Sequence, residues 1–259
     1  MRSRKVKKTA SKSSLYWYAI IAVMLILVAL IIAIVMQKNG LFSKVQQPIE
    51  QIPEVVIEQP IKEEQPAVPA HEVDENGYIK NQTLPKEPTY INGILIASKR
   101  YPMPADFAPG EQPEAKEAKD KMLADAKKAG FILDAFSGYR SYDYQKTLYE
   151  NYVARDGQDA ADRYSARPGY SEHQTGLVYD IGEVGKESLW LTETFGETEA
   201  GRWLRDHAHH YGFIMRYPQG KEDITGYMYE SWHFRYVGVE VATTIFEQQS
   251  TLEEYLGVQ

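Results

Sequence analysis

The sequence predicts an α+β domain with a small antiparallel sheet and flanking helices. Segments of helical and of strand periodicity are mixed, without the regular βαβ alternation that a parallel sheet requires. From Tyr90 onwards the chain offers about 165 residues, enough for one hydrophobic core. The 259 residues include no Cys, which excludes disulfides, thiolate metal sites and cysteine nucleophiles.

Helix signals occur at four places in this part of the chain. Pro113 and Gly130 mark the start and the stop of the first helix, and Ser141 can cap the second. The expected helices are 113–129, 142–154, 196–211 and 239–248. A polar, Arg-rich loop is expected after the second helix, as far as Gly169.

Strand signals alternate with these helices. Leu177 to Ile181 is a short apolar run that follows a glycine, which is typical of a strand that leaves a turn. The expected strands, the first of them a strand or hairpin arm, are 91–97, 131–136, 177–181, 213–217 and 228–236.

An apolar run near the N-terminus predicts a membrane anchor. Residues 15–36 are 22 residues without charge, Gly or Pro, and about 20 apolar residues span a bilayer core. Six cations and no acid lie in residues 1–14, so the positive-inside rule places this basic tip in the cytoplasm. The alternative of a cleaved signal peptide fits less well, because the run is long and no small-x-small site follows it.

Residues 37–88 predict an extended extracellular linker, because Pro recurs among Gln and Glu with only isolated aliphatic residues. The folded domain is then expected over 89–259, outside the cell and anchored in the cell membrane by a single span.

A cysteine-free ectodomain on one anchor suggests a Gram-positive cell. The six cations of the tip leave the rest of the chain with a net charge of −13 instead of −7, which argues against nucleic-acid binding. A monomer is expected.

Several hydrolase motifs are absent from the sequence. There is no H-E-x-x-H, no G-x-S-x-G, no Ser three residues before a Lys, and no P-loop. These absences leave water activated by a metal as the main route to hydrolysis.

His173, Asp180 and His233 could supply the three protein ligands of a catalytic zinc. Gly176 permits a tight turn between the first two, and Asp180 lies in an otherwise apolar strand where a carboxylate needs a metal or an Arg as partner. Taken separately, each histidine is more often a structural residue than a ligand.

Glu230 could be the base that takes a proton from the attacking water. It lies three residues before His233, and on a regular strand the two side chains would point to opposite faces. They can share a site only if the strand is bulged or begins just after Glu230.

Arg140 lies in the segment Ser137-Gly138-Tyr139-Arg140-Ser141, at an expected strand-to-helix junction. It can be a surface residue in a turn or a cation aimed at a carboxylate or an oxyanion. The His207-Ala208-His209-His210 cluster is interpreted as a solvated helix face rather than a metal site.

Together, S-G-Y-R-S at 137–141, S-E-H-Q-T-G-x-x-x-D at 171–180 and E-x-W-H at 230–233 resemble the VanY-type zinc D-alanyl-D-alanine carboxypeptidases and the related L,D-carboxypeptidases of bacterial cell walls. The resemblance covers about residues 90–255. It implies a small α+β fold with one Zn²⁺ at the bottom of a groove that binds peptidoglycan stem peptides.

Carried over by motif position, the resemblance assigns His173, Asp180 and His233 as zinc ligands and Glu230 as general base and then acid. Arg140 would stabilise the oxyanion or hold the substrate carboxylate. Further substrate contacts are expected from Ser137, Gln145 and Ser171. The implied activity is release of D-alanine from stem peptides, with D,D- and L,D-cleavage both open. The alternatives are a cross-bridge endopeptidase and a non-catalytic peptidoglycan-binding module of the same fold.

Overall fold

The structure is a computed structural model that describes Met24 and residues 72–258. The chain divides into two units, Met1–Ala67 and Val68–Gln259, and the second holds the folded domain. Within the part that is described, no helix is both long enough and apolar enough to cross a membrane. Apart from Met24, the predicted anchor lies outside the described residues, as do the predicted tip and the linker up to residue 71.

Four strands form the central sheet in the order β3-β4-β6-β5, and every neighbouring pair is antiparallel. The strands are β3 (Leu133–Ser137), β4 (Val178–Glu183), β5 (Phe213–Met215) and β6 (His233–Tyr236). A separate hairpin consists of β1 (Thr89–Ile91) and β2 (Ile94–Ile96). The α+β class with small antiparallel sheets is confirmed.

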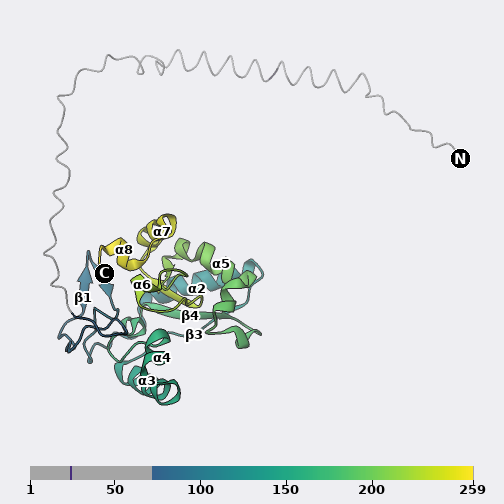
Figure 1. The fold of residues 1–259 in the computed structure, drawn as a ribbon. Coiled ribbons are helices and arrows are strands. Elements are labelled where there is room, and N and C mark those ends of the chain that lie inside the picture. Colours follow the sequence, from purple (N-terminus) through teal and green to yellow (C-terminus); the bar gives the residue numbers. More distant parts are fainter. Residues whose placement is uncertain (1–23, 25–71, 259) are drawn as a thin grey trace, which may run out of the picture. The chain divides into compact units, whose positions relative to one another are not determined.

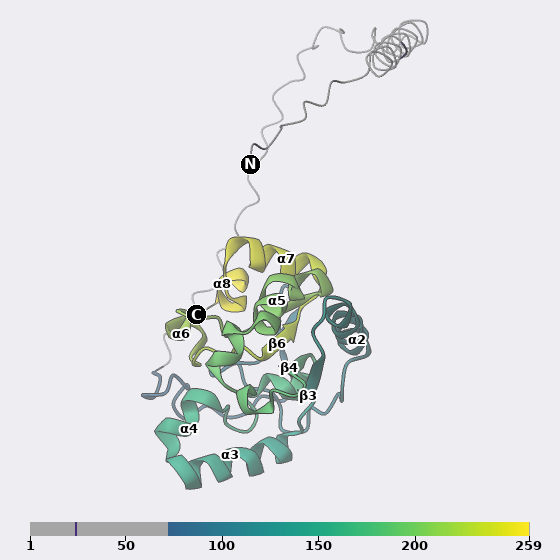
Figure 2. The same cartoon turned by 90° about the vertical axis from the view of Figure 1, so that its right-hand side faces the viewer.

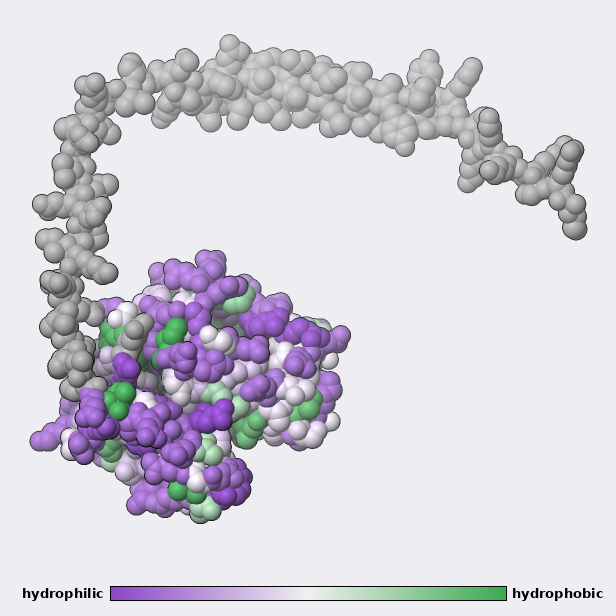
Figure 3. Space-filling model, viewed as in Figure 1, coloured by the Kyte–Doolittle hydropathy of each residue, from purple (hydrophilic) through white to green (hydrophobic). Residues whose placement is uncertain are grey.

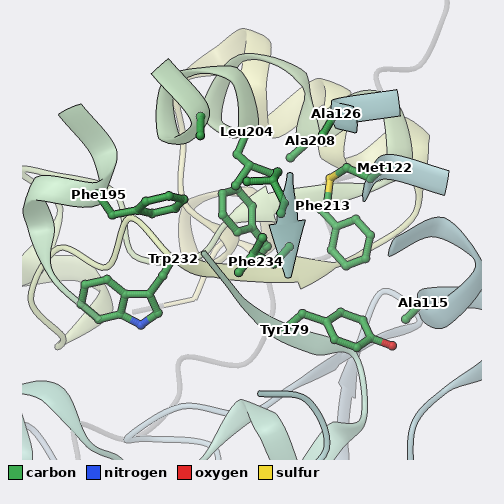
Figure 4. Close-up of a cluster of buried hydrophobic side chains, with 13 residues drawn as sticks. Ala115, Met122, Ala126, Tyr179, Phe195, Leu204, Ala208, Phe213, Trp232 and Phe234 are labelled. Carbon is green, nitrogen blue, oxygen red and sulfur yellow. The ribbon is translucent and has the colours of Figure 1, made fainter. Parts of the chain in front are cut away.

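One face of the sheet carries the main hydrophobic core. Tyr179 and Phe234 are buried on this face against α2 (Pro113–Lys128) and α5 (Glu199–His207). Figure 4 shows these two rings together with Phe213 and side chains from the covering helices. Figures 1 and 2 show α5 on one side of β4, and α3 (Tyr142–Asp156) with α4 (Gln158–Tyr164) on the other.

Alternation along the strands turns other side chains away from this core. Asp180 follows Tyr179 on β4, and His233 precedes Phe234 on β6, so both point to the opposite face. Asp180 is the register partner of His233 on one side and of Ser137 on the other. The sheet thereby places three candidate residues from distant parts of the chain in one row.

The C-terminal helices cover a second apolar cluster. They are α7 (Val239–Gln248), which has the predicted bounds, and α8 (Leu252–Leu256), which the sequence did not suggest. Both contribute buried side chains that pack with Ile96 of β2 and Ile214 of β5. On the face shown in Figure 3, hydrophobic residues form only small separate patches, as expected when the core is enclosed.

The helix expected over 196–211 is divided into three pieces. A 3₁₀ turn, η3 (Glu193–Glu197), precedes α5, and another, η4 (Ala208–Tyr211), follows it. The hydroxyl of Thr198 accepts a hydrogen bond from the Gly201 backbone N–H at 2.9 Å and so starts α5 as a new helix. The expected loop after α3 contains α4, whose seven residues show no clear apolar stripe. The short α6 (Glu222–Thr225) was not expected either.

Residues 72–88 fall within the predicted linker but are folded in the structure. Tyr78 is only 1% exposed, and its hydroxyl accepts a hydrogen bond from the Arg167 backbone N–H at 3.1 Å. The same hydroxyl lies 3.4 Å from that of Tyr227. The folded domain therefore includes the segment from residue 72, because Tyr78, an aromatic residue among prolines and acids, packs into the core.

Candidate active site

The site is built around His173, Asp180 and His233, which are all buried. One ligand atom from each lies within 4.8 Å of the other two. His173 comes from the 3₁₀ turn η1 (Glu172–Thr175), Asp180 from β4 and His233 from β6. Three histidine or carboxylate donors that converge in this way are the usual protein ligands of a catalytic zinc.

Gly176 makes the turn that joins His173 to β4. Its φ is +73°, and an added Cβ would lie 1.9 Å from the Gly110 carbonyl oxygen. A side chain at this position would therefore clash with backbone, and the left-handed conformation would be strained as well. Only glycine lets the chain leave η1 and enter the sheet within so few residues.

The imidazole of His173 is prepared for metal binding by a hydrogen bond to backbone. Its Nδ1 lies 2.7 Å from the Gly138 carbonyl oxygen, which can only accept, so Nδ1 carries the proton. Nε2 is left buried without a hydrogen-bond partner, 3.3 Å from Asp180 Oδ2. Burial, assisted by the Arg140 guanidinium, lowers the pKa of His173 to about 4. The ring is therefore neutral at physiological pH, as a metal ligand must be.

His233 faces two carboxylates through the same nitrogen. Its Nδ1 lies 3.4 Å from Asp180 Oδ1 and 3.3 Å from Glu230 Oε2. Burial alone would lower the pKa of His233, but the carboxylates of Asp180, Glu172 and Glu230 raise it well above its ordinary value. Asp180 Oδ1 is itself buried without a hydrogen-bond partner. A divalent cation among these atoms would balance the carboxylate charge, so the residues fit the implied Zn²⁺.

Glu230 shares the site because β6 begins only at His233. The Glu230 backbone N–H donates to the Tyr217 carbonyl, and the His233 N–H approaches the Glu230 carbonyl at 3.4 Å, which makes a turn instead of a strand. The strand therefore begins just after Glu230, which is one of the two geometries that the sequence analysis allowed for Glu230 and His233 to share a site. Burial raises the pKa of Glu230, although His233 opposes the shift. A raised pKa suits a group that must accept and then return a proton.

Arg140 is held at the edge of the cluster from two sides. Its backbone N–H donates to the His173 carbonyl at 3.1 Å, and its Nη1 donates to Gln145 Oε1 at 3.0 Å. Nη2 lies 3.7 Å from Asp180 Oδ2, and Nε is buried without a partner. Ser141 caps α3 directly after Arg140 by accepting from the Tyr144 N–H. The guanidinium thus keeps free N–H groups on one edge.

Asp180 and His233 of the cluster line a groove with a volume of about 530 Å³, and His173 lies behind them. Ser137, Ser171, Arg140 and Glu230 all line it. Gln145 does not: its side chain is buried and donates to Ser165 and Ala166 while it accepts from Arg140. Gln145 is therefore placed to orient Arg140.

Aromatic side chains make up much of the remaining wall, and the sequence did not indicate which of its 19 tyrosines, or which other rings, would line a groove. They are Phe136, Tyr144, Tyr152, Tyr164, Tyr217, Tyr227 and Trp232. Their ring faces and hydroxyls can contact a peptide along its length. No periodic pattern in the sequence marks them, because they come from several elements and meet only in the fold.

The His207–His210 cluster does not meet the metal-binding geometry that His173, Asp180 and His233 meet within the described residues. It differs from the expected solvated face, because His209 is 7% exposed and stacks on Phe246 at 3.7 Å between ring centroids. His207 stacks on Trp203 at 4.8 Å. Both rings are used for packing.

Comparison with known proteins agrees with this geometry. A family model described as VanY, D-alanyl-D-alanine carboxypeptidase, matches residues 110–239, which include every candidate site residue. The putative carboxypeptidase YodJ of Bacillus subtilis (strain 168) is 42% identical over 183 residues, 63% of this chain and 67% of that protein. The matched region thus spans about two thirds of that relative's length.

Two solved structures are similar to the domain. The LD-carboxypeptidase LdcB is 50% identical, with a TM-score of 0.58 over 64% of this chain and 86% of that chain. The vancomycin resistance D,D-pentapeptidase VanY from a VanB-type cassette, a mutant in complex with Zn(II), is 34% identical, with a TM-score of 0.54 over 62% of this chain and 97% of that chain.

Proposed function

The chain belongs to the VanY family of D-alanyl-D-alanine carboxypeptidases, and from this premise we propose that it is a zinc carboxypeptidase that removes the terminal D-alanine from peptidoglycan stem peptides. The observation that carries the proposal is the convergence of His173, Asp180 and His233 at a groove that Glu230 and Arg140 also line. A relative of known structure in complex with Zn(II) supports the choice of metal.

Zn²⁺ would be held by His173 Nε2, a carboxylate oxygen of Asp180 and His233 Nδ1. When bound, the ion supplies a Lewis acid that polarises the scissile carbonyl and acidifies water. The unpartnered His173 Nε2 and Asp180 Oδ1 support this assignment, because buried polar atoms normally have a partner.

Glu230 takes the proton from the attacking water and returns it to the amine of the departing D-alanine. Its burial and raised pKa suit both steps. Arg140 presents its free Nε and neighbouring Nη2 to the C-terminal carboxylate of the substrate or to the oxyanion, in the bidentate manner that guanidinium groups favour. Gln145 keeps this edge directed at the groove by holding Nη1.

The preferred substrate is the tetrapeptide stem, in which the terminal bond joins an L- to a D-residue. The identity to two L,D-carboxypeptidases, LdcB and the DacB enzyme of Streptococcus pneumoniae, is 50% and 49%, whereas it is 34% to the D,D-pentapeptidase. Incubation of the zinc-loaded protein with tetrapeptide and pentapeptide stems, followed by mass analysis, tests this preference. Faster cleavage of the pentapeptide would reverse it.

Replacement of Glu230 tests the mechanism. Glu230→Gln should retain one zinc and the fold but lose about 10³–10⁴-fold in turnover, because one residue serves as base and acid. Glu240→Gln, at an exposed position on α7, is the matched control and should cleave as wild type does.

The readouts are D-alanine release and zinc content. A Glu230→Gln protein that holds zinc and cleaves within about tenfold of wild type, below the usual range for acid–base assistance, would remove Glu230 from the mechanism. A wild type that binds stems without releasing an amino acid would favour a binding module. Cleavage of cross-linked stems alone would favour an endopeptidase.

The same proposal places the domain outside the cell membrane, tethered through residues 15–36. The uncharged 22-residue run and the six preceding cations support this orientation. Protease added to intact cells should then release the folded domain. Release only from ruptured cells would show that the orientation is reversed.

A further inference from the structure

Four buried charged side chains form a network that begins beside His233, at Glu172 in the wall of the groove, and leads away from it. They are Glu172, Arg216, Arg235 and Glu253, and each is at most 5% exposed. Arg216 donates to Glu172 through Nε at 2.8 Å, and Arg235 donates to the same oxygen, Oε1, through Nη1 at 2.8 Å. Two guanidinium groups therefore hold one oxygen of Glu172.

The other oxygen of Glu172 points at a candidate zinc ligand. Glu172 Oε2 lies 3.5 Å from His233 Nε2, and neither atom has another hydrogen-bond partner. The opposite ring nitrogen, Nδ1, faces Asp180 and Glu230. A carboxylate that receives the N–H of one ring nitrogen leaves the lone pair of the other for a metal.

The carboxylate of Glu172 is fixed by these contacts. Arg216 and Arg235 approach Oε1 from two different segments of the chain, and both hydrogen bonds are 2.8 Å long. Oε2 is thereby held in place opposite His233 Nε2.

The network continues to the C-terminal helix. Arg216 also binds Glu253 of α8 in a bidentate pair, with Nη1 to Oε2 at 2.8 Å and Nη2 to Oε1 at 2.5 Å. Glu253 is not among the residues that line the groove. Arg235 is fixed from another side by donating to the Leu95 carbonyl of β2.

Buried ion pairs contribute little net stability compared with apolar residues of similar volume, so the fold alone does not require this arrangement. We propose that Glu172 is a positioning residue that turns Nδ1 of His233 toward the metal, and that α8 acts on the metal site through Glu253 and Arg216. This inference rests on the proposed zinc function. It adds a helix outside the groove to the determinants of metal affinity.

The test measures zinc affinity in the purified full-length protein by competition with a chelator of known affinity. Glu172→Gln should weaken zinc binding about 10–100-fold, as expected for a lost partner of a metal-binding histidine. Glu253→Gln should weaken it in the same direction by a smaller factor. Glu254→Gln, next to Glu253 but exposed and paired with Lys221, is the matched control and should bind as wild type does.

A second readout separates positioning from simple stabilisation. Substitution of zinc by Co²⁺ reports ligand geometry through its visible absorption, and the band should change in Glu172→Gln and Glu253→Gln but not in Glu254→Gln. The melting temperature of the metal-free proteins is recorded alongside. If Glu172→Gln does not fold, Glu253→Gln and Arg216→Lys, which keeps the charge but loses the planar fork, still test the relay.

Unchanged zinc affinity and cobalt spectra in folded variants with lowered melting temperatures would overturn the inference and leave the network a purely structural one. A wild type that binds zinc tightly but does not cleave stems would contradict the proposed function without affecting this test. A wild type that binds no zinc would overturn both.

Discussion

Lys99 is a buried cation whose amine is bound by backbone carbonyls. Its Nζ donates to the carbonyl oxygens of Asn76 and Asp162 at 2.9 and 2.8 Å, and lies 4.5 Å from the ring centroid of Tyr227. Burial lowers the pKa of Lys99 to about 8, although the Asp162 carboxylate opposes this. Lys99 thereby connects segment 72–88 to Tyr227 in the wall of the groove. Burial disfavours the charged form of its amine.

The stability contribution of Lys99 should depend on pH. Because its pKa is about 8 when folded and 10.5 when unfolded, the unfolded chain binds more protons between these values. The unfolding free energy of wild type should therefore rise relative to Lys99→Met above pH 8, by at most about 1.4 kcal/mol per pH unit, the limit for one proton. Urea unfolding of both proteins from pH 7 to 10 measures the difference. A difference that stays constant would contradict the prediction.

The start of β6 decides whether Glu230 can act with His233. The sequence predicts a strand over 228–236, in which the two side chains would diverge. In the structure the Glu230 backbone pairs with Tyr217 in a turn, and regular pairing with β4 begins at His233. A strand shortened by five residues at its start therefore brings base and ligand within 3.3 Å. A strand ends where its backbone groups no longer find partners, and this depends on the neighbouring segments of the fold.

The folded segment 72–88 is a second element whose role can be tested. A fragment 72–259 should be more stable than a fragment 89–259, because the shorter one loses Tyr78, which is 1% exposed. Removal of a large buried side chain costs about 3–5 kcal/mol of unfolding free energy. Urea unfolding of both fragments measures the difference.

Tyr78→Phe in the longer fragment is the control for this comparison. It keeps the ring and loses the hydroxyl that accepts from Arg167, so its cost should be nearer about 1 kcal/mol. Equal stability of the two fragments would return the domain boundary to residue 89.

At the scale of the whole domain, the sheet separates packing from chemistry. One face carries the apolar core, with Tyr179 and Phe234 under the helices, as Figure 4 shows. The other face carries Asp180 and His233, which are register partners on adjacent antiparallel strands. The rigid core thus fixes the distance between candidate ligands that are 53 positions apart in the chain.

Apolar periodicity sufficed to predict the α+β class, which the structure confirms. Three motifs that resemble those of a known family pointed to His173, Asp180 and His233, which the structure brings together. The membrane span over residues 15–36 stays a prediction, because apart from Met24 it lies outside the described residues. Helices such as α7 were placed correctly because one apolar stripe spans the entire element.

Only the tertiary structure decided how Glu172 and Gln145 are used, which aromatic residues form the groove and where the domain begins. Glu172 lies beside a predicted ligand, yet its partners Arg216 and Arg235 follow 44 and 63 residues later in the chain. Glu253, the second partner of Arg216, follows 81 residues after Glu172. The sequence predicted that Gln145 contacts the substrate, but in the structure its amide oxygen accepts a hydrogen bond from Arg140. Such assignments rest on contacts between segments far apart in sequence, and a local pattern carries no information about which distant side chain will arrive beside it.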